Sequence, residues 1–387
     1  MIDIELLAAT APAADLKMWA YVGFIALVGI FLALDLGVFH RDAHEVGMKE
    51  SVVWSVIWLA CGLSFTAFVY HGYERNWLGL GLNTPTYVDG AIVLGEVPGG
   101  TAAIQYLTGY VVEKSLAMDN IFVIAMIFGY FAIPAKYQHR VLFWGIVGAL
   151  IMRGAMIYLG AELIIRYTWI LIVFGLFLVL TALKMALIKS HGDPGSNPVV
   201  RFAKRFFRTV DFYDGQKFFT RRTVAPVYVK DPGSGREVQA PAAPGTLSAR
   251  HAITPLFLAL IMVEVTDLVF AVDSIPAIFA ITPDPFIVFT SNIFALLGLR
   301  ALYFCLAALI ARFRFLKPAL ILILAFVGIK LLLLATPPYL DDLGLAADEI
   351  KSIKIDPLVS LAIVVGTLAA ATVMSVLMPA KSVSKTG

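Results

Sequence analysis

The feature that most limits how this chain can fold is a series of long apolar stretches. A helix needs about 20 mostly apolar residues to cross the hydrocarbon core of a bilayer. The stretches that meet this length are residues 19–39, 51–71, 102–132, 141–161, 167–188, 253–281, 286–311, 318–336 and 357–378. The sequence therefore predicts an all-α fold, a polytopic membrane protein with about nine transmembrane helices.

The composition agrees with this and excludes several classes of protein. Apolar residues make up 60% of the 387 residues and charged residues 15%, with a mean hydropathy of +0.85. Soluble globular proteins have roughly 45–50% apolar and about 25% charged residues. A water-soluble enzyme, a disordered chain and a fibrous chain are excluded. The 2 cysteines, Cys61 and Cys305, lie in apolar stretches, so a disulfide framework is excluded as well.

The distribution of Lys and Arg between alternate loops predicts the orientation. Twenty lie in the loops on one side, including Arg41 and the segment 189–250, and five lie on the other, including Lys17 and Arg75. Cytoplasmic loops carry the excess of positive charge. The N-terminus is predicted outside and the C-terminus in the cytoplasm. The acidic start lacks the basic region of a cleavable signal peptide, so the first span is expected to be retained.

The stretch 190–252 is the one substantial polar segment, and it is basic. Residues 201–208 are expected to form a short amphipathic helix that rests on anionic lipids of the inner leaflet. Residues 223–240 suggest a hairpin. The positive-inside bias explains the charge, so no nucleic-acid binding is expected, and nothing in the segment looks catalytic.

Two segments of the sequence match each other and define an internal repeat. Glu113, Asp119, Asn120 and the following Ile align with Asp267, Asp273, Ser274 and its following Ile. Further along, Arg153 aligns with Arg300, and Lys184 with Lys330. Each copy holds three spans, an odd number, so the second copy enters the membrane from the opposite side. Inverted repeats of this kind are typical of secondary transporters, whose sites lie near the midplane.

The repeat divides the chain into five parts. They are a two-helix segment (1–100), repeat 1 (101–189), the cytoplasmic basic loop (190–252), repeat 2 (253–336), and an outer loop with the last transmembrane helix (337–387).

Ionisable residues within the spans are candidates for function, because they are costly in a membrane. The acidic ones are Asp35, Glu113, Asp119, Glu264, Asp267 and Asp273, and the basic ones are Lys114, Arg153, Lys184, Arg300 and Lys330. The alternative is that they form structural ion pairs between helices. Lys184 is expected to extend toward the interface. Arg153 and Arg300 are either counter-charges for the carboxylates or parts of a gate. Asp35 lies outside the repeats and is a candidate for the site or for a proton path.

The spacing of the carboxylates constrains how they can share a site. Glu264 and Asp267 are three residues apart and lie on one helix face. Glu113 and Asp119, like Asp267 and Asp273, are six apart and point about 120° away from each other in an intact helix. Both can face one small site if the helix unwinds or the groove is wide, and Pro276 favours a local break in the second copy.

The ligand chemistry of these residues suits a hard cation. Carboxylate, amide, hydroxyl and backbone carbonyl oxygens are typical ligands of Mg²⁺, Ca²⁺ and Mn²⁺. No His lies within a span near the motifs, and the Met118 thioether beside Asp119 is more simply a packing residue.

The motifs resemble those of a known family. Glu113-Lys-Ser-Leu-Ala-Met-Asp-Asn-Ile-Phe and Glu264-Val-Thr-Asp-Leu-Val-Phe-Ala-Val-Asp-Ser-Ile-Pro-Ala are similar to the two signature motifs of the TerC/Alx family. Thr290-Ser-Asn-Ile-Phe-Ala-Leu-Leu-Gly-Leu-Arg-Ala-Leu-Tyr303 and Asp35-Leu-Gly-Val-Phe also resemble family segments.

The resemblance implies a bacterial inner-membrane protein related to exporters of the LysE type. The family is named for tellurite resistance, and its members are implicated in Mn²⁺ export. It also implies metal-site residues at Glu113, Asp119, Asn120, Asp267 and Asp273, with Glu264 close by. Ser274, Arg153, Arg300 and Asp35 are the supporting or gating candidates.

The leading hypothesis is a secondary transporter, not an enzyme, that exports a divalent cation, most simply Mn²⁺, through a midplane carboxylate site. No tightly bound cofactor is expected, and the expected partners are the transported cation and membrane lipids. Protein partners and the relation to tellurite are left open. The alternatives are a non-transporting scaffold of a resistance or secretion complex that works through the basic loop, an intramembrane aspartyl hydrolase, and a LysE-like exporter of small solutes.

Overall fold

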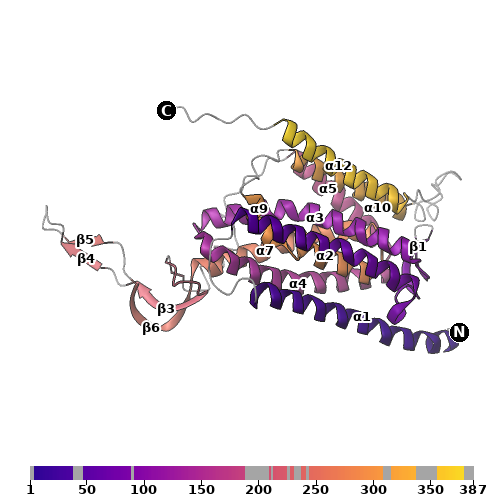
Figure 1. The fold of residues 1–387 in the computed structure, drawn as a ribbon, viewed down its shortest axis with the longest axis horizontal. Helices are drawn as coiled ribbons and strands as arrows, with labels where there is room; N and C mark the ends of the chain where they lie inside the picture. Colours follow the sequence, from indigo (N-terminus) through magenta and orange to yellow (C-terminus); the bar gives the residue numbers. More distant parts are fainter. Residues whose placement is uncertain are drawn as a thin grey trace.

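The structure is a computed structural model that describes residues 4–37, 47–88, 91–187, 209–210, 212–224, 227–230, 237–240, 244–307, 315–336 and 355–378. Long helices run alongside one another, and short strands lie at the ends of the bundle (Figure 1). The helices are α1 (Ile4–Gly37), α2 (Met48–Glu74), η1 (Trp77–Gly79), α3 (Gly99–Tyr130), α4 (Ala135–Arg166), α5 (Ile170–Leu187), α7 (Pro255–Phe279), α8 (Pro285–Leu296), α9 (Leu299–Ala307), α10 (Leu316–Ala335) and α12 (Pro357–Leu377). The strands are β1 (Thr84–Val88), β2 (Ala91–Gly95), β3 (Phe219–Val224), β4 (Val227–Lys230), β5 (Glu237–Ala240) and β6 (Pro244–Ile253).

Eight candidate membrane spans are found among the described residues, which confirms a helical, multi-pass membrane protein. The peripheral ones are apolar yet hardly buried within the protein: the windows in α1 and α2 bury only 17% and 22% of their residues. Large apolar side chains such as Ile151 and Leu377 are 70% and 74% exposed. Apolar surface of this extent is stable against lipid and not against water.

Helix α3 is a ninth long helix and lies inside the bundle. It is not among the eight candidate spans, and it carries Glu113, Lys114 and Asp119. With 32 residues it is about 48 Å long, more than a bilayer core requires. It packs against α2, α7, α8 and α12. This arrangement fits the predicted count of about nine helices.

Three helices begin with the same local sequence, a capping residue followed by proline. Thr254, Asp284 and Asp356 precede α7, α8 and α12, whose first residue is proline in each case. Proline suits the first helical position because that N–H has no partner in the helix. Asp284 Oδ1 accepts a hydrogen bond from the Phe286 N–H at 2.9 Å, which satisfies one of the free amides at the start of α8.

The predicted break between the carboxylates of the second motif is wrong. Helix α7 is continuous from Pro255 to Phe279, with Pro276 inside it. Because Pro276 lies in the last turn, the missing N–H removes one bond close to the helix end and the helix continues to that end. The break lies in the next span instead, between α8 and α9, where Gly298 has φ +80°.

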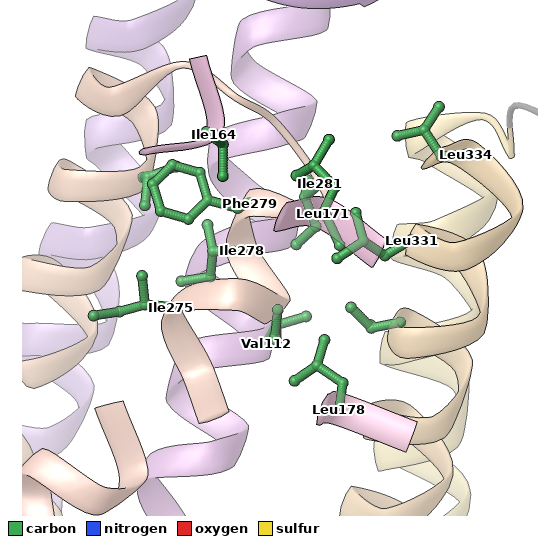
Figure 2. Close-up of a cluster of buried hydrophobic side chains, with 14 of the residues drawn as sticks. Val112, Ile164, Leu171, Leu178, Ile275, Ile278, Phe279, Ile281, Leu331 and Leu334 are labelled. Atoms are coloured by element: carbon green, nitrogen blue, oxygen red, sulfur yellow. The ribbon is translucent and has the colours of Figure 1, made fainter. Parts of the chain in front are cut away.

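The contacts between helices fit the predicted inverted repeat. The first helix of each copy packs on the second helix of the other, α3 on α8 and α7 on α4. The two first helices pack on each other, as do the two third helices, α5 and α10. Figure 2 shows part of the apolar cluster that joins them, with Leu171 and Leu178 of α5 facing Leu331 of α10, and Ile275 and Ile278 of α7 beside them.

The strands lie outside the helices and were only partly predicted. The hairpin of β4 and β5, antiparallel with Tyr228 opposite Gln239, falls within the predicted 223–240. The antiparallel pairs β3–β6 and β1–β2 were not predicted. The predicted helix at 201–208 lies outside the described residues.

A buried carboxylate at the α7–α8 junction should make stability depend on pH. Asp284 is 4% exposed and accepts a hydrogen bond from the Tyr73 hydroxyl. Burial raises the pKa of Asp284, against the smaller opposite effects of the Tyr73 hydroxyl, the Phe286 amide and the Lys17 ammonium. A raised folded-state pKa means that the folded state binds the proton more tightly than the unfolded state does. The free energy of unfolding therefore gains from Asp284 as the pH falls from neutral, with the gain complete below the ordinary Asp pKa of about 3.9.

We expect Asp284→Asn to remove this contribution. Thermal unfolding of wild type and variant in detergent, compared stepwise between about pH 7 and pH 4, measures it. The unfolding midpoint of wild type, relative to that of Asp284→Asn, should rise as the pH falls. A constant difference over that range would contradict the assignment.

Candidate functional site

The centre of the bundle holds a cluster of buried polar side chains from four helices. Its members are Glu113 and Asn120 of α3, Arg153 of α4, Asp267 and Ser274 of α7, and Asn292 of α8. All six are at most 3% exposed. A polar group buried to this degree is stable only when hydrogen bonds or ion pairs compensate its lost hydration. We call these six residues the central cluster.

Arg153 holds the central cluster together and joins the two predicted repeats. Its guanidinium pairs with Glu113 of repeat 1. It also donates two hydrogen bonds to the Asp267 carboxylate of repeat 2, from Nε to Oδ2 and from Nη2 to Oδ1, both at 3.2 Å. Nη1 further donates to Asn292 Oδ1 at 2.7 Å and to Ser274 Oγ at 3.3 Å. The planar fork of an Arg fits this bidentate geometry in a way that a Lys does not.

Some acceptors of the central cluster have no partner among the described residues. Asn120 Nδ2 donates to Asp267 Oδ1 at 2.9 Å, but Asn120 Oδ1 accepts nothing, and neither does Glu113 Oε2. Leaving a buried acceptor unsatisfied costs about 1–3 kcal/mol, and more for a charged group. The two free oxygens, one from the Glu113 carboxylate and one from the amide that contacts Asp267, favour a cation.

The charge balance points the same way. Glu113 and Asp267 bring two negative charges and Arg153 one positive charge, so the central cluster is left with one net negative charge. Glu264 lies one turn before Asp267 on α7 and brings a third carboxyl group nearby. Its Oε2 is also buried without a partner in the described part of the chain. A bound cation would offset the net negative charge of the central cluster.

The structure separates some of the predicted site residues from the central cluster. Asp273 accepts a hydrogen bond from Thr181 of α5 at 3.2 Å and lies on another face of α7. Arg300 is 4% exposed and lines a small cavity with Leu297 and Gly298 at the α8–α9 break. Asp35 and Asp119 are within helices, but their side chains lie outside the described ones. Among the described residues, no group of three or more His, Cys, Asp and Glu is placed to hold a metal ion.

The Glu264 carboxylate lies against α4 at Gly148, where the absence of a side chain leaves room for it. A Cβ at Gly148 would lie 2.0 Å from Glu264 Oε1, far inside van der Waals contact. Only glycine at position 148 leaves this carboxylate where it is.

Sequence reasoning missed Asn292 as a site residue. It lies in a run of three polar residues, Thr290, Ser291 and Asn292, within an otherwise apolar span, and all three are fully buried. The span that contains them, Pro285–Cys305, is 89% buried, the most of the eight. The run of three polar residues in an apolar span was the sequence signal that could have found it.

Fold and site together define a polytopic helical membrane protein with a charged centre where α3, α4, α7 and α8 meet. The sequence model of the "Integral membrane protein TerC family" matches residues 99–383. The chain belongs to the TerC family, which confirms the resemblance drawn from its motifs.

Curated relatives cover most of the chain. An uncharacterized membrane protein of Myxococcus xanthus is 40% identical over 361 residues, which are 93% of this chain and 92% of the relative. The Escherichia coli K12 protein named "Putative membrane-bound redox modulator Alx" is 42% identical over 315 residues, 80% of this chain and 84% of the relative. No solved structure is significantly similar to the chain.

Proposed function

We propose that this protein is a secondary transporter that exports a divalent cation, most simply Mn²⁺, through the central cluster. The observation that carries the proposal is the pair of unsatisfied buried oxygens, Glu113 Oε2 and Asn120 Oδ1, beside the Asp267 carboxylate. Oxygen ligands of this kind suit hard divalent ions. The proposed cargo is the cation itself, and the chain contributes the ligands, the counter-charge and the path.

Competition from Arg153 would weaken cation binding at the central cluster and so favour release of the transported ion. The guanidinium already occupies the two carboxylates, so an arriving cation must compete with it for Glu113 and Asp267. Because the Arg153 guanidinium competes for the same carboxylates, the cation binds weakly enough to dissociate, and export requires that dissociation. Because Arg153 contacts both repeats, loading the cation also loosens the link between them, and this supports alternating access.

Cation flux into proteoliposomes tests the proposal. We expect wild type to carry radiolabelled Mn²⁺, and Glu113→Gln and Asp267→Asn to lose flux by at least about tenfold, since each removes a charge from the ligand set. The Asp119→Ala and Asp273→Ala variants test the outer members of the predicted site. Absence of flux from correctly inserted wild type, with and without a proton or sodium gradient, would refute the proposal.

Gly148 offers a test that leaves every charge in place. Gly148→Ala should push the Glu264 carboxylate aside, because it would meet the new Cβ. The displaced group is the end of a flexible side chain, so we expect a small loss of stability, about 1 kcal/mol or less, and a large loss of flux. Gly129→Ala on α3 is the matched control, since a Cβ there meets nothing within 4 Å. Equal flux in the Gly148→Ala and Gly129→Ala variants would show that Glu264 takes no part in transport.

A further inference from the structure

The break between α8 and α9 leaves backbone carbonyls that a continuous helix would satisfy. Helix α8 ends at Leu296, Gly298 adopts φ +80°, and α9 starts at Leu299. In an unbroken helix, the carbonyls of Ala295 and Leu297 would accept from the N–H groups four residues further on. The carbonyl end of α8 also carries the negative end of the helix dipole. Both effects favour a positive charge at this point.

The positive charge at this point is supplied by Lys114 of the facing helix α3. Its Nζ donates to the Ala295 carbonyl at 3.1 Å and to the Leu297 carbonyl at 3.3 Å. Among the described side chains, no carboxylate lies within ion-pair distance of Lys114. The backbone carbonyls are thus its described partners, and the ammonium is held as a coordinated ion would be.

Carbonyls of a broken transmembrane helix are the usual ligands of the sodium ion in secondary transporters. We propose that the α8–α9 break is a monovalent-cation site of this kind, with the Lys114 ammonium as its permanent, tethered occupant. The wild-type break then has no room for a free alkali ion. Transport through the central cluster accordingly does not draw on sodium at this position.

The break borders open space as well as the Lys114 ammonium. A small cavity adjoins it, lined by Trp58 of α2 and by Leu297, Gly298 and Arg300. The Lys114 side chain is only partly buried, so removing it opens space that a small ion can reach. Helix α2 packs tightly against the break at Gly298, because a Cβ at Gly298 would lie 2.4 Å from the Trp58 Cβ.

Replacing the tethered cation should turn the break into a binding site for free ions. We expect Lys114→Met to melt well below wild type in choline chloride. In sodium, lithium or potassium chloride at the same ionic strength, its midpoint should rise by roughly 2–4 °C. Wild type should melt at the same temperature in all four salts. Purified protein in detergent is sufficient, so the result does not depend on whether the protein transports Mn²⁺.

Lys330→Met is the matched control. Lys330 is 7% exposed and donates to the Ser360 hydroxyl at 2.8 Å, with no backbone carbonyl pair among its described partners. Its loss should lower the midpoint without any preference for small cations. If Lys114→Met shows no more preference for sodium, lithium or potassium over choline than Lys330→Met does, the proposal fails.

Two conservative variants keep the test decisive should Lys114→Met not fold. Lys114→Arg retains the charge, and Lys114→Gln retains N–H donors without the charge. The proposal expects Lys114→Arg to melt near wild type and Lys114→Gln clearly below it. Equal midpoints for these two variants would show that the carbonyls need a donor and not a cation, which overturns the assignment.

Discussion

Arg153→Met should lower the free energy of unfolding by about 3–5 kcal/mol, the usual result of removing one partner from a buried ion pair. Arg153 is 1% exposed, and its guanidinium compensates two buried carboxylates at once, Glu113 and Asp267. Without it, both carboxylates must either stay charged without a counter-charge or take up protons. Chemical or thermal unfolding in detergent measures the loss. Arg166→Met, at the exposed end of the same helix α4, is the control and should change little.

Two further measurements separate the role of the charge from that of packing. Glu113→Gln combined with Arg153→Met should be less destabilised than Arg153→Met alone, because one of the uncompensated charges is gone. Added Mn²⁺ should raise the midpoint of Arg153→Met more than that of wild type, since the cation takes the place of the guanidinium. If Mn²⁺ stabilises both proteins equally, the guanidinium and the cation do not compete for one site.

Gly298→Ala should be strongly destabilising, for two independent reasons. The left-handed backbone at φ +80° costs a non-glycine residue about 1–2 kcal/mol. The new Cβ would in addition lie 2.4 Å from the Trp58 Cβ of α2, an overlap that no side-chain rotation relieves. Together we expect a loss of about 2–4 kcal/mol in stability, with flux lost as well because α8 carries Asn292.

The control for this substitution is Gly366→Ala in α12, where a Cβ meets nothing within 4 Å. Alanine is favoured over glycine within a helix by about 0.5–1 kcal/mol, so this variant should be neutral or slightly stabilised. Trp58→Ala should not rescue Gly298→Ala, since the overlapping atom is the Cβ that alanine keeps. A Gly298→Ala protein that melts like wild type would mean that the backbone between α8 and α9 adjusts to the new Cβ at little cost in stability.

The sequence was a good guide to the helices and to the residues that matter, for a clear physical reason. Apolar stretches of membrane-spanning length can satisfy their backbone groups in lipid only as helices, so the helical, multi-pass fold needed no tertiary information. The alignment of Glu113 with Asp267 and of Asn120 with Ser274 selected four members of the central cluster. Arg153 was recognised as a counter-charge candidate because a mid-span Arg cannot easily reach water.

Other features depended on contacts between distant segments, and a sequence pattern carries little of that information. Pro276 indicated a helix break, but its effect depends on how far the helix continues beyond it, and α7 ends three residues later. Gly298 gave no stronger signal than other glycines in apolar spans. Its role follows from the approach of Trp58, which is 240 positions earlier in the chain.

By itself, then, the sequence determined that this is a multi-pass helical membrane protein with paired carboxylate motifs, because hydrophobic length and repeated charges are local properties. Only the tertiary structure decided which carboxylates meet. It brought Glu113 and Asp267 onto one guanidinium and left Asp273 with Thr181 on another face of α7. It also paired Lys114 with the open end of α8. Such partnerships are set by which helix faces pack together, and a helix sequence alone does not fix which neighbour each of its faces meets.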